Sequence, residues 1–304
     1  MHCKIDLPAQ WVDASGLERA LQRGGDPHGL GVYDVWIRFP AGCKMMTDAT
    51  IRLLSLTNQL AFTTRRVRLD FDEGKAGTMG YLNRIGFFDH LAPEVEVTPC
   101  RPSYSGAALF RGGNAGVVEI ARINKDHRDR GLPERLTEAV SRSCGTRADA
   151  AELEGAAWMI FAELIDNVFS HSETPLDGYA ALQVYKNGNR LMVAVSDSGL
   201  GIMETLRPTL QTESPKLASL SDVDLLVEVF RHGLSRHGID RGCGLKGSAA
   251  KAIKFKADLD VRLPTQRVFL SPARDSYQAN TAYCYDRLPL LWGTHIGFIF
   301  ALEA

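Results

Sequence analysis

Runs of hydrophobic residues predict alternating strands and helices in the first 125 residues of the chain. Strand-forming runs lie over 32–39, 66–71 and 117–123, and apolar residues at helical spacing lie over 48–62. Strands that alternate with helices are typical of a small α/β layer. We therefore expect the N-terminal part to form an α/β domain.

Two segments of this part carry weaker patterns. Residues 1–30 are expected to be irregular, because the glycines and proline of 24–27 interrupt any helix that begins at Leu17. Hydrophobic residues three apart between 79 and 88 predict one short helix that ends near Asp89.

A long amphipathic helix is predicted over 148–170, at the start of the second half. Glu163, Asn167 and His171 follow one another at four-residue steps and therefore lie on one face of this helix. An apolar stripe occupies a different face and consists of Leu153, Ala157, Ile160, Leu164 and Val168.

Beyond Pro175 the pattern changes to a period of two. Residues 179–185 and 190–196 predict two strands, and the Asn-Gly pair between them is a strong hairpin signal. Periodicity is weak over 203–241, apart from a capping box that begins at Ser221. Further strands are predicted over 258–263, 267–270, 282–285 and 295–301.

These elements indicate an α+β protein with two units. We expect a small α/β domain over residues 1–125, a connector over 126–144, and a larger domain over 145–304. A chain of 304 residues with 45% hydrophobic residues can bury a sizeable core in each domain.

Charge and cysteine content exclude several classes of protein. The formal net charge of -1 gives no global basic field, so nucleic acid is not indicated as a partner. The N-terminus lacks the features of a signal peptide and no apolar stretch is long enough for a bilayer, so we expect a cytoplasmic protein without a membrane partner. The six cysteines lack Cys-x-x-Cys spacing, which favours reduced, mostly buried thiols over a zinc site or a disulfide framework.

Glu163 and Asn167 supply chemistry that a magnesium nucleotide needs. A neutral amide oxygen can ligate Mg²⁺ while the ion keeps several waters. A carboxylate one helical turn away can deprotonate a water that attacks a terminal phosphate. For the pair in isolation, a solvated polar helix face is the simpler interpretation.

Asp197 ends the second strand of the hairpin and begins a turn that contains Gly199 and Gly201. A carboxylate here can accept a hydrogen bond from an exocyclic amine, and it would favour adenine because guanine presents a carbonyl at that position. The glycines allow the backbone to approach a flat ring closely. An aspartate that only caps the turn is the alternative.

A glycine-rich segment from Gly242 to Lys246 opens another predicted helix. Gly242 and Gly244 precede Leu245 at the start of this helix, where free backbone amides can face phosphates. Lys246 can add positive charge, although a lysine in a first helical turn is unfavourable against the helix dipole. The segment is therefore a candidate phosphate loop.

In this order, the motifs resemble those of the GHKL ATP-binding superfamily, which includes gyrase, the ninety-kilodalton heat-shock chaperone, histidine kinases and MutL. The matching segments are Glu163 to Asn167 for the N box, Asp197 to Gly201 for the first glycine box, Gly242 to Gly244 for the second, and Gly293-Thr294 for the last. The resemblance covers about residues 145–304.

The resemblance implies a Bergerat-type α/β sandwich, with a mixed sheet under helices and an ATP lid over 203–241. It implies ATP and Mg²⁺ as cofactors. The implied roles are Glu163 as general base or water-orienting group, Asn167 on Mg²⁺, Asp197, Gly199, Gly201 and Thr294 at the adenine, and Gly242, Gly244, Leu245 and Lys246 at the phosphates.

Three functions remain open within this resemblance. The first is an ATP-hydrolysing signalling switch, whose lid signals to the N-terminal domain or to a second subunit. The second is a serine/threonine or histidine protein kinase similar to the anti-sigma-factor kinases, and the third is an ATP sensor without turnover. The N-terminal element order is similar to that of STAS domains, with Thr78 as the candidate phosphoacceptor. We expect a protein partner or self-association through this domain.

Overall fold

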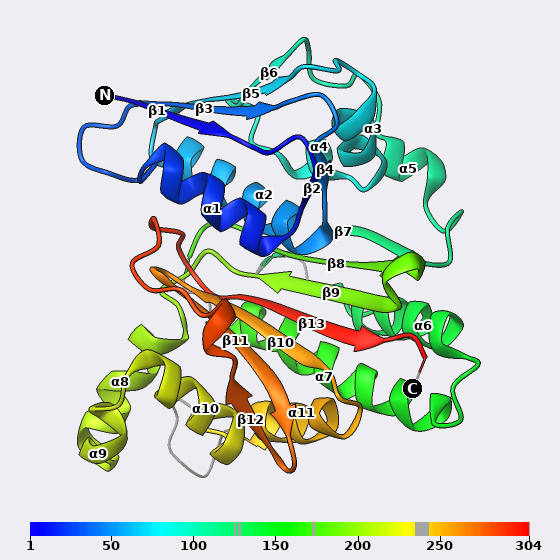
Figure 1. The fold of residues 1–304 in the computed structure, drawn as a ribbon, viewed down its shortest axis with the longest axis vertical. Helices are drawn as coiled ribbons and strands as arrows, with labels where there is room; N and C mark the ends of the chain where they lie inside the picture. Colours follow the sequence, from blue (N-terminus) through cyan, green and yellow to red (C-terminus); the bar gives the residue numbers. More distant parts are fainter. Residues whose placement is uncertain (125, 127–128, 172–173, 235–242, 304) are drawn as a thin grey trace.

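The computed structural model describes residues 1–124, 126, 129–171, 174–234 and 243–303. In this part of the chain, a four-stranded parallel sheet and a seven-stranded antiparallel sheet alternate with two helical layers (Figure 1). The parallel sheet has the order β1-β3-β5-β6 and consists of β1 (His2–Asp6), β3 (Asp34–Phe39), β5 (Arg66–Phe71) and β6 (Glu96–Thr98).

Two helices separate the sheets, namely α1 (Ala14–Gly24) and α2 (Thr47–Phe62). Every residue of α2 from Thr47 to Leu60 is buried, because the helix is covered on both sides. Shorter elements complete this N-terminal unit: β2 (Trp11–Val12), β4 (Lys44–Met45), α3 (Gly77–Arg84), α4 (Phe87–His90) and α5 (Gly106–Phe110).

The antiparallel sheet has the strand order β12-β11-β10-β13-β9-β8-β7. Its strands are β7 (Val117–Ile123), β8 (Gly178–Tyr185), β9 (Arg190–Ser196), β10 (Asp258–Leu263), β11 (Gln266–Ala273), β12 (Ser276–Ala279) and β13 (His295–Ala301). The helices of this unit are α6 (Leu132–Cys144), α7 (Ala150–His171), α8 (Ile202–Glu213), α9 (Pro215–Ala218), α10 (Asp222–His232) and α11 (Cys243–Lys254).

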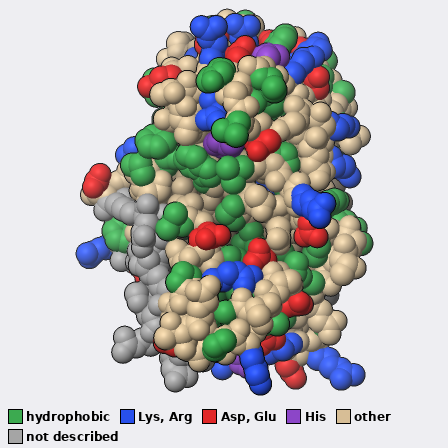
Figure 2. Space-filling view, turned by 90° about the vertical axis from the view of Figure 1, so that its left-hand side faces the viewer, with side chains coloured by type: hydrophobic (Ala, Val, Ile, Leu, Met, Phe, Trp, Pro, Cys, Tyr) green, Lys and Arg blue, Asp and Glu red, His purple; other side chains and the backbone are tan. Residues whose placement is uncertain are grey.

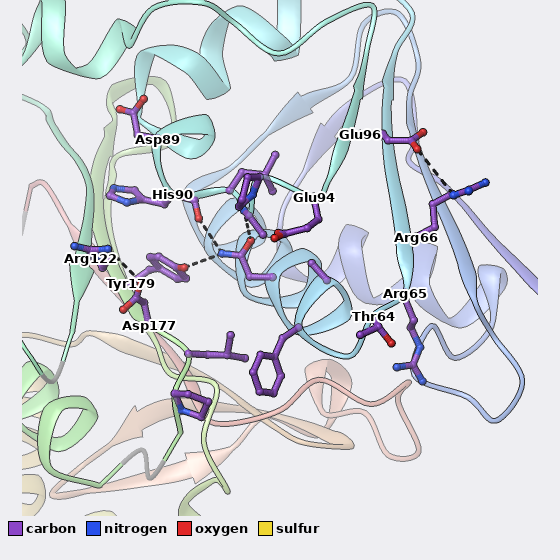
Figure 3. A pocket seen from close by; sticks show the side chains of 18 of the residues that line it. Thr64, Arg65, Arg66, Asp89, His90, Glu94, Glu96, Arg122, Asp177 and Tyr179 are labelled. Carbon is purple, nitrogen blue, oxygen red and sulfur yellow. Dashed lines mark hydrogen bonds and ion pairs between the residues drawn. The ribbon is translucent and has the colours of Figure 1, made fainter.

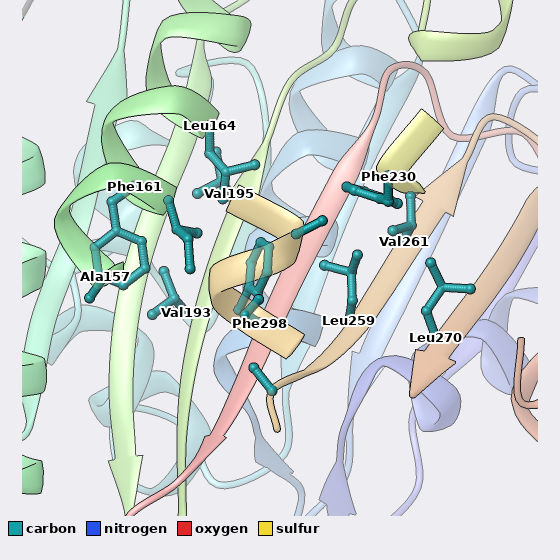
Figure 4. Close-up of a cluster of buried hydrophobic side chains, with 14 of the residues drawn as sticks. Ala157, Phe161, Leu164, Val193, Val195, Phe230, Leu259, Val261, Leu270 and Phe298 are labelled. Carbon is teal, nitrogen blue, oxygen red and sulfur yellow. The ribbon is translucent and has the colours of Figure 1, made fainter. Parts of the chain in front are cut away.

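Strand alternation gives the antiparallel sheet two buried faces. Val193 and Val195 of β9 and Phe298 of β13 point into the core beneath α7 and α11 (Figure 4). Ala194 of β9 and Tyr179 of β8 face the opposite way and join the core around α2. The sheet therefore serves as the common wall of both units.

Hydrogen bonds connect α2 to this sheet at several positions along the seam between them. The backbone amide of Thr47 donates to the Tyr185 hydroxyl at 2.9 Å, and the Ser55 and Ser196 hydroxyls lie 3.0 Å apart. Further along α2, the side-chain nitrogen Nδ2 of Asn58 donates to the Tyr179 hydroxyl at 2.7 Å.

Six buried charged residues form a cluster at the same seam, where α1 and α2 meet β10 and β11. Arg52 of α2 lies 3.5 Å from Glu18 of α1 and 3.1 Å from Asp260 of β10. The remaining pairs are Arg262–Glu18 at 2.9 Å and Arg267–Asp260 at 2.8 Å, and Asp48 is the sixth charged residue. The cluster holds three basic and three acidic side chains, so its formal charges balance.

The outer surface carries mixed charge. On the face shown in Figure 2, basic and acidic side chains are interspersed, in keeping with the net charge of -1. Among the described residues, no helix is both long and apolar enough to cross a membrane.

The mixed α/β architecture agrees with the predicted α+β class, and several elements are confirmed. The strands β5, β7 and β13 have the predicted bounds, and β8 and β9 form the hairpin signalled by Asn-Gly. The Ser221 hydroxyl accepts from the Asp224 amide, as expected for the cap of α10.

Other expectations were wrong. The first 30 residues contain β1 and α1, because Asp13 caps the helix and the break at Gly25 ends it instead of preventing it. The larger sheet is antiparallel throughout, where a mixed sheet was expected. Because β7 pairs with β8, the expected boundary near residue 125 does not separate the two sheets.

Two shorter segments also differ from expectation. The single short helix near Asp89 is divided into α3 and α4 by Gly86, which has a φ of 86°. The strand expected over 282–285 is a 3-10 turn (Thr281–Tyr283) followed by an isolated bridge at Tyr285.

Candidate functional site

Glu163 and Asn167 lie one turn apart on α7 and contact each other. The Asn167 side-chain nitrogen donates to Glu163 Oε1 at 3.2 Å, which directs the amide oxygen of Asn167 away from Glu163. Both side chains are partly buried. Burial raises the pKa of Glu163, and the negative charge of Asp166 adds to this, while the bond from Asn167 opposes it. A raised pKa brings a carboxylate nearer to the range of a general base.

Asp197 and Thr294 form a clasp between the end of β9 and the start of β13. Asp197 Oδ1 accepts from the Gly199 amide at 2.8 Å, and Oδ2 accepts from the Thr294 amide at 3.2 Å. The backbone amide of Asp197 in turn donates to the Thr294 carbonyl at 3.1 Å. The Thr294 hydroxyl accepts from the Ile202 amide at 3.0 Å and thereby caps α8.

Two glycines make this clasp sterically possible. Gly293 has a φ of 89°, and a Cβ atom there would lie 2.3 Å from the Asp197 carbonyl oxygen. Gly201 has a φ of 88°, which a side chain rarely adopts. The glycines that the sequence associated with a ligand are thus also required by the fold.

Strand alternation places the clasp on the face of the sheet that packs against α7. In β9, Val193 and Val195 face the core under α7, whereas Ser196 faces α2. Asp197 follows Ser196 and continues the α7-facing series. Thr294 precedes His295, which pairs with Ser196, so Thr294 lies on the same side as Asp197.

The electrostatics of Asp197 are unusual for a carboxylate. Burial raises its pKa to about 6, even though the hydrogen bonds from Gly199 and Thr294 lower it. The group is ionised at neutral pH but poorly solvated. A further hydrogen-bond donor would stabilise its charge.

The predicted phosphate loop is only partly described. Gly242 lies outside the described residues, and so do the side chains of Leu245 and His171. Gly244 and Leu245 belong to the first turn of α11, and the Lys246 side chain of the same turn is exposed. The phosphate role of this segment stays a prediction.

The predicted residues therefore form two hydrogen-bonded groups on one side of the sheet. The first is the pair on α7, and the second comprises Asp197, Gly199 and Thr294, with Gly201 beside them in the turn before α8. In the described ranges, no cluster of three or more His, Cys, Asp or Glu residues could hold a metal by itself. Asn167 with nucleotide phosphates still fits Mg²⁺, which commonly takes one or two protein ligands.

Sequence reasoning missed residues that support the clasp from α2. Gln59 bonds to Ser198 and Trp292, which flank Asp197 and Gly293 in the sequence. A single glutamine in an apolar helix gives no local signal of a partner 233 residues away.

A large cleft opens elsewhere, at the seam of the two units (Figure 3). It has a volume of about 1130 Å³, and its wall includes His90, Tyr179 and Glu94. Charged residues in the wall pair with one another, as Arg122 does with Asp177 at 3.6 Å. Of the predicted site residues that the structure describes, none is among those that line this cleft.

No protein-family model matches the chain, and no curated protein matches it by sequence. The GHKL resemblance therefore depends on the motifs and on the geometry described above.

Proposed function

We propose that the larger unit binds Mg-ATP and hydrolyses it, so that the protein acts as a nucleotide-driven switch of the GHKL type. The observation that carries this proposal is the Asp197 carboxylate, held by the Gly199 and Thr294 amides on the face of the sheet that packs against α7. A poorly solvated carboxylate gains from a ligand that donates a hydrogen bond, and the exocyclic amine of adenine is such a donor.

The α7 pair would act at the other end of the nucleotide. Asn167 offers an amide oxygen to Mg²⁺, which supplies neutralisation of the phosphate charge when it is bound. Glu163 accepts the proton of the attacking water, and its partial burial favours this role because the carboxylate is more basic than one in water. General-base catalysis of this kind contributes about 10²–10⁴-fold in rate.

Incubation with γ-labelled ATP and Mg²⁺ tests the proposal directly. The wild type should release labelled phosphate, and Glu163→Ala should bind ATP in calorimetry but release phosphate at least about a hundredfold more slowly. Asp197→Asn should lose ATP binding. Wild-type affinity in Asp197→Asn would remove the adenine assignment, and unchanged turnover in Glu163→Ala would remove Glu163 from the mechanism.

The same assay separates the two other functions. A labelled protein band would identify a kinase, and binding without any labelled product would identify a sensor. Thr78 is a poor acceptor in the folded chain, because its hydroxyl is buried and donates to the Cys43 carbonyl. A kinase of this fold would thus label a residue other than Thr78.

A further inference from the structure

Helix α2 of the N-terminal unit reaches the loops that carry the proposed adenine site. Gln59 is fully buried and makes three hydrogen bonds across the seam. Its side-chain nitrogen donates to Ser198 Oγ at 2.9 Å and to the Trp292 carbonyl at 3.0 Å. Its side-chain oxygen accepts from the Trp292 amide at 2.9 Å.

These bonds hold the two halves of the clasp at a fixed separation. Ser198 directly follows Asp197, and Trp292 directly precedes Gly293 in the loop before β13. One side chain therefore bridges the β9 loop and the β13 loop. The clasp between Asp197 and Thr294 bridges the same loops from the other face of the sheet, which packs against α7.

Two neighbouring contacts restrict the loops further. Ser55 lies one turn before Gln59 on α2 and bonds to Ser196, so α2 holds the residues on both sides of Asp197. The ring of His28 stacks on the Trp292 ring, with centroids 5.1 Å apart and planes at 22°. The side chains of Ser55, Gln59 and His28 thus connect the N-terminal unit to these loops.

We propose that Gln59 is a positioning residue for the adenine site, through which the N-terminal unit sets nucleotide affinity and base selectivity. This inference rests on the proposed ATP binding. Gln59 lies on the face of the sheet opposite Asp197, so it acts only by fixing the loops. Selectivity depends on this because a displaced carboxylate no longer meets the exocyclic amine at hydrogen-bond distance.

The test compares Gln59→Leu with Asn58→Leu. Asn58 is the preceding residue and is also buried; it bonds across the seam to the Tyr179 hydroxyl, and within the N-terminal unit to the His90 carbonyl. Its side-chain hydrogen bonds in the described structure go to His90, Tyr179 and Ala92, and not to Ser198 or Trp292. A loss of general seam stability affects both variants, whereas a loss of site geometry affects only Gln59→Leu.

Calorimetric titration of the full chain with Mg-ATP and Mg-GTP, together with melting temperatures, gives the result. We expect Gln59→Leu to weaken ATP binding about tenfold or more, with a smaller change for GTP. Asn58→Leu should melt earlier but keep its ATP dissociation constant within about threefold. If Gln59→Leu does not fold, Gln59→Glu, which keeps the acceptor for the Trp292 amide, should show a smaller loss of the same ATP-over-GTP preference.

Three outcomes would overturn the inference, and they differ from one another. An ATP affinity of Gln59→Leu within threefold of the wild type overturns the role of Gln59 alone, as does an equal loss of affinity in Asn58→Leu. Absence of nucleotide binding in the wild type overturns the proposed function as well.

Discussion

The balanced charge cluster at the seam gives a quantitative test of how the two units are joined. Arg52 is 2% exposed and pairs with Glu18 and Asp260. Arg52→Met leaves each carboxylate one partner, since Arg262 remains on Glu18 and Arg267 on Asp260. The cluster changes from neutral to a net charge of -1 without access to water.

Removing one partner from a buried ion pair costs about 3–5 kcal/mol. Because both carboxylates keep a partner, we expect a loss near the lower value, about 3 kcal/mol, from a typical stability of about 5–15 kcal/mol. With a urea m-value of about 3 kcal/mol/M, the unfolding midpoint would fall by about 1 M.

Asp48→Asn supplies the second arm of a double-mutant cycle. Burial raises the pKa of Asp48 although Arg52 opposes this, and Asp48 Oδ1 is a buried atom without a hydrogen-bond partner in the described structure. An asparagine can keep the bond that Oδ2 accepts from the Ala14 amide at 2.9 Å. In the Arg52→Met background, Asp48→Asn should restore neutrality and recover about 1–2 kcal/mol.

The assay is urea unfolding followed by far-ultraviolet circular dichroism and tryptophan fluorescence, which should report one coincident transition. Arg68→Met is the matched control, because its ion pair with Glu96 at 3.1 Å is exposed and should change stability by less than about 1 kcal/mol. The reasoning fails if Arg52→Met behaves like Arg68→Met, or if Asp48→Asn destabilises the Arg52→Met protein further.

Three further outcomes are expected. Gly293→Ala should abolish nucleotide binding and lower the free energy of unfolding by about 1–3 kcal/mol, because the new Cβ would meet the Asp197 backbone. Gly297→Ala is the control: no atom lies closer than 3.8 Å to the position of its Cβ, so this variant should bind nucleotide normally in calorimetry. Equal binding by both variants would contradict the clasp. The ¹³C carboxyl resonance of Asp197 should titrate near pH 6 in the free protein. With nucleotide bound it should titrate at lower pH, because a donated hydrogen bond favours the ionised carboxylate. An unchanged midpoint would argue against contact with adenine. Burial, and secondly the charge of Arg65, lower the pKa of His28 to about 4. As the pH falls from about 6.5 to 4, the unfolded chain therefore takes up a proton that the folded chain does not, and the free energy of unfolding falls over that window. His28→Phe should make this decline shallower by at most about 1.4 kcal/mol per pH unit, and an unaltered slope would refute the assignment.

Local signals explain which elements the sequence predicted correctly. The apolar stripe of α7 and the Asn-Gly turn before Arg190 act over a few residues, and the structure follows them. Although the bond between Asp197 and Thr294 spans 97 residues, the position of Asp197 directly after β9 is a local feature of the same kind. Such features depend on neighbours in sequence, which a pattern can represent.

Non-local pairing explains what the sequence did not predict. Arg262 is fully buried at the side of Glu18, a residue 244 positions away, yet each resembles a solvated charge in its own segment. The antiparallel arrangement of the larger sheet, and the membership of β7 in it, likewise follow from contacts between distant strands. No periodicity within one segment carries that information.

The two occupied faces of the larger sheet restrict how a nucleotide could influence the N-terminal unit. A unit joined by a free linker can rotate as a body, but rotation here would expose α2 and separate six buried charges. A change at the proposed adenine site would instead act through small displacements of the loops beside Asp197 and Gly293. Gln59 bonds to both loops and Ser55 bonds to Ser196, so such a displacement would change the hydrogen bonds of these α2 side chains. The sequence indicated a separate regulatory or partner-binding domain, whereas the structure joins the N-terminal unit to the larger sheet through a buried seam that includes Ser55, Gln59 and His28.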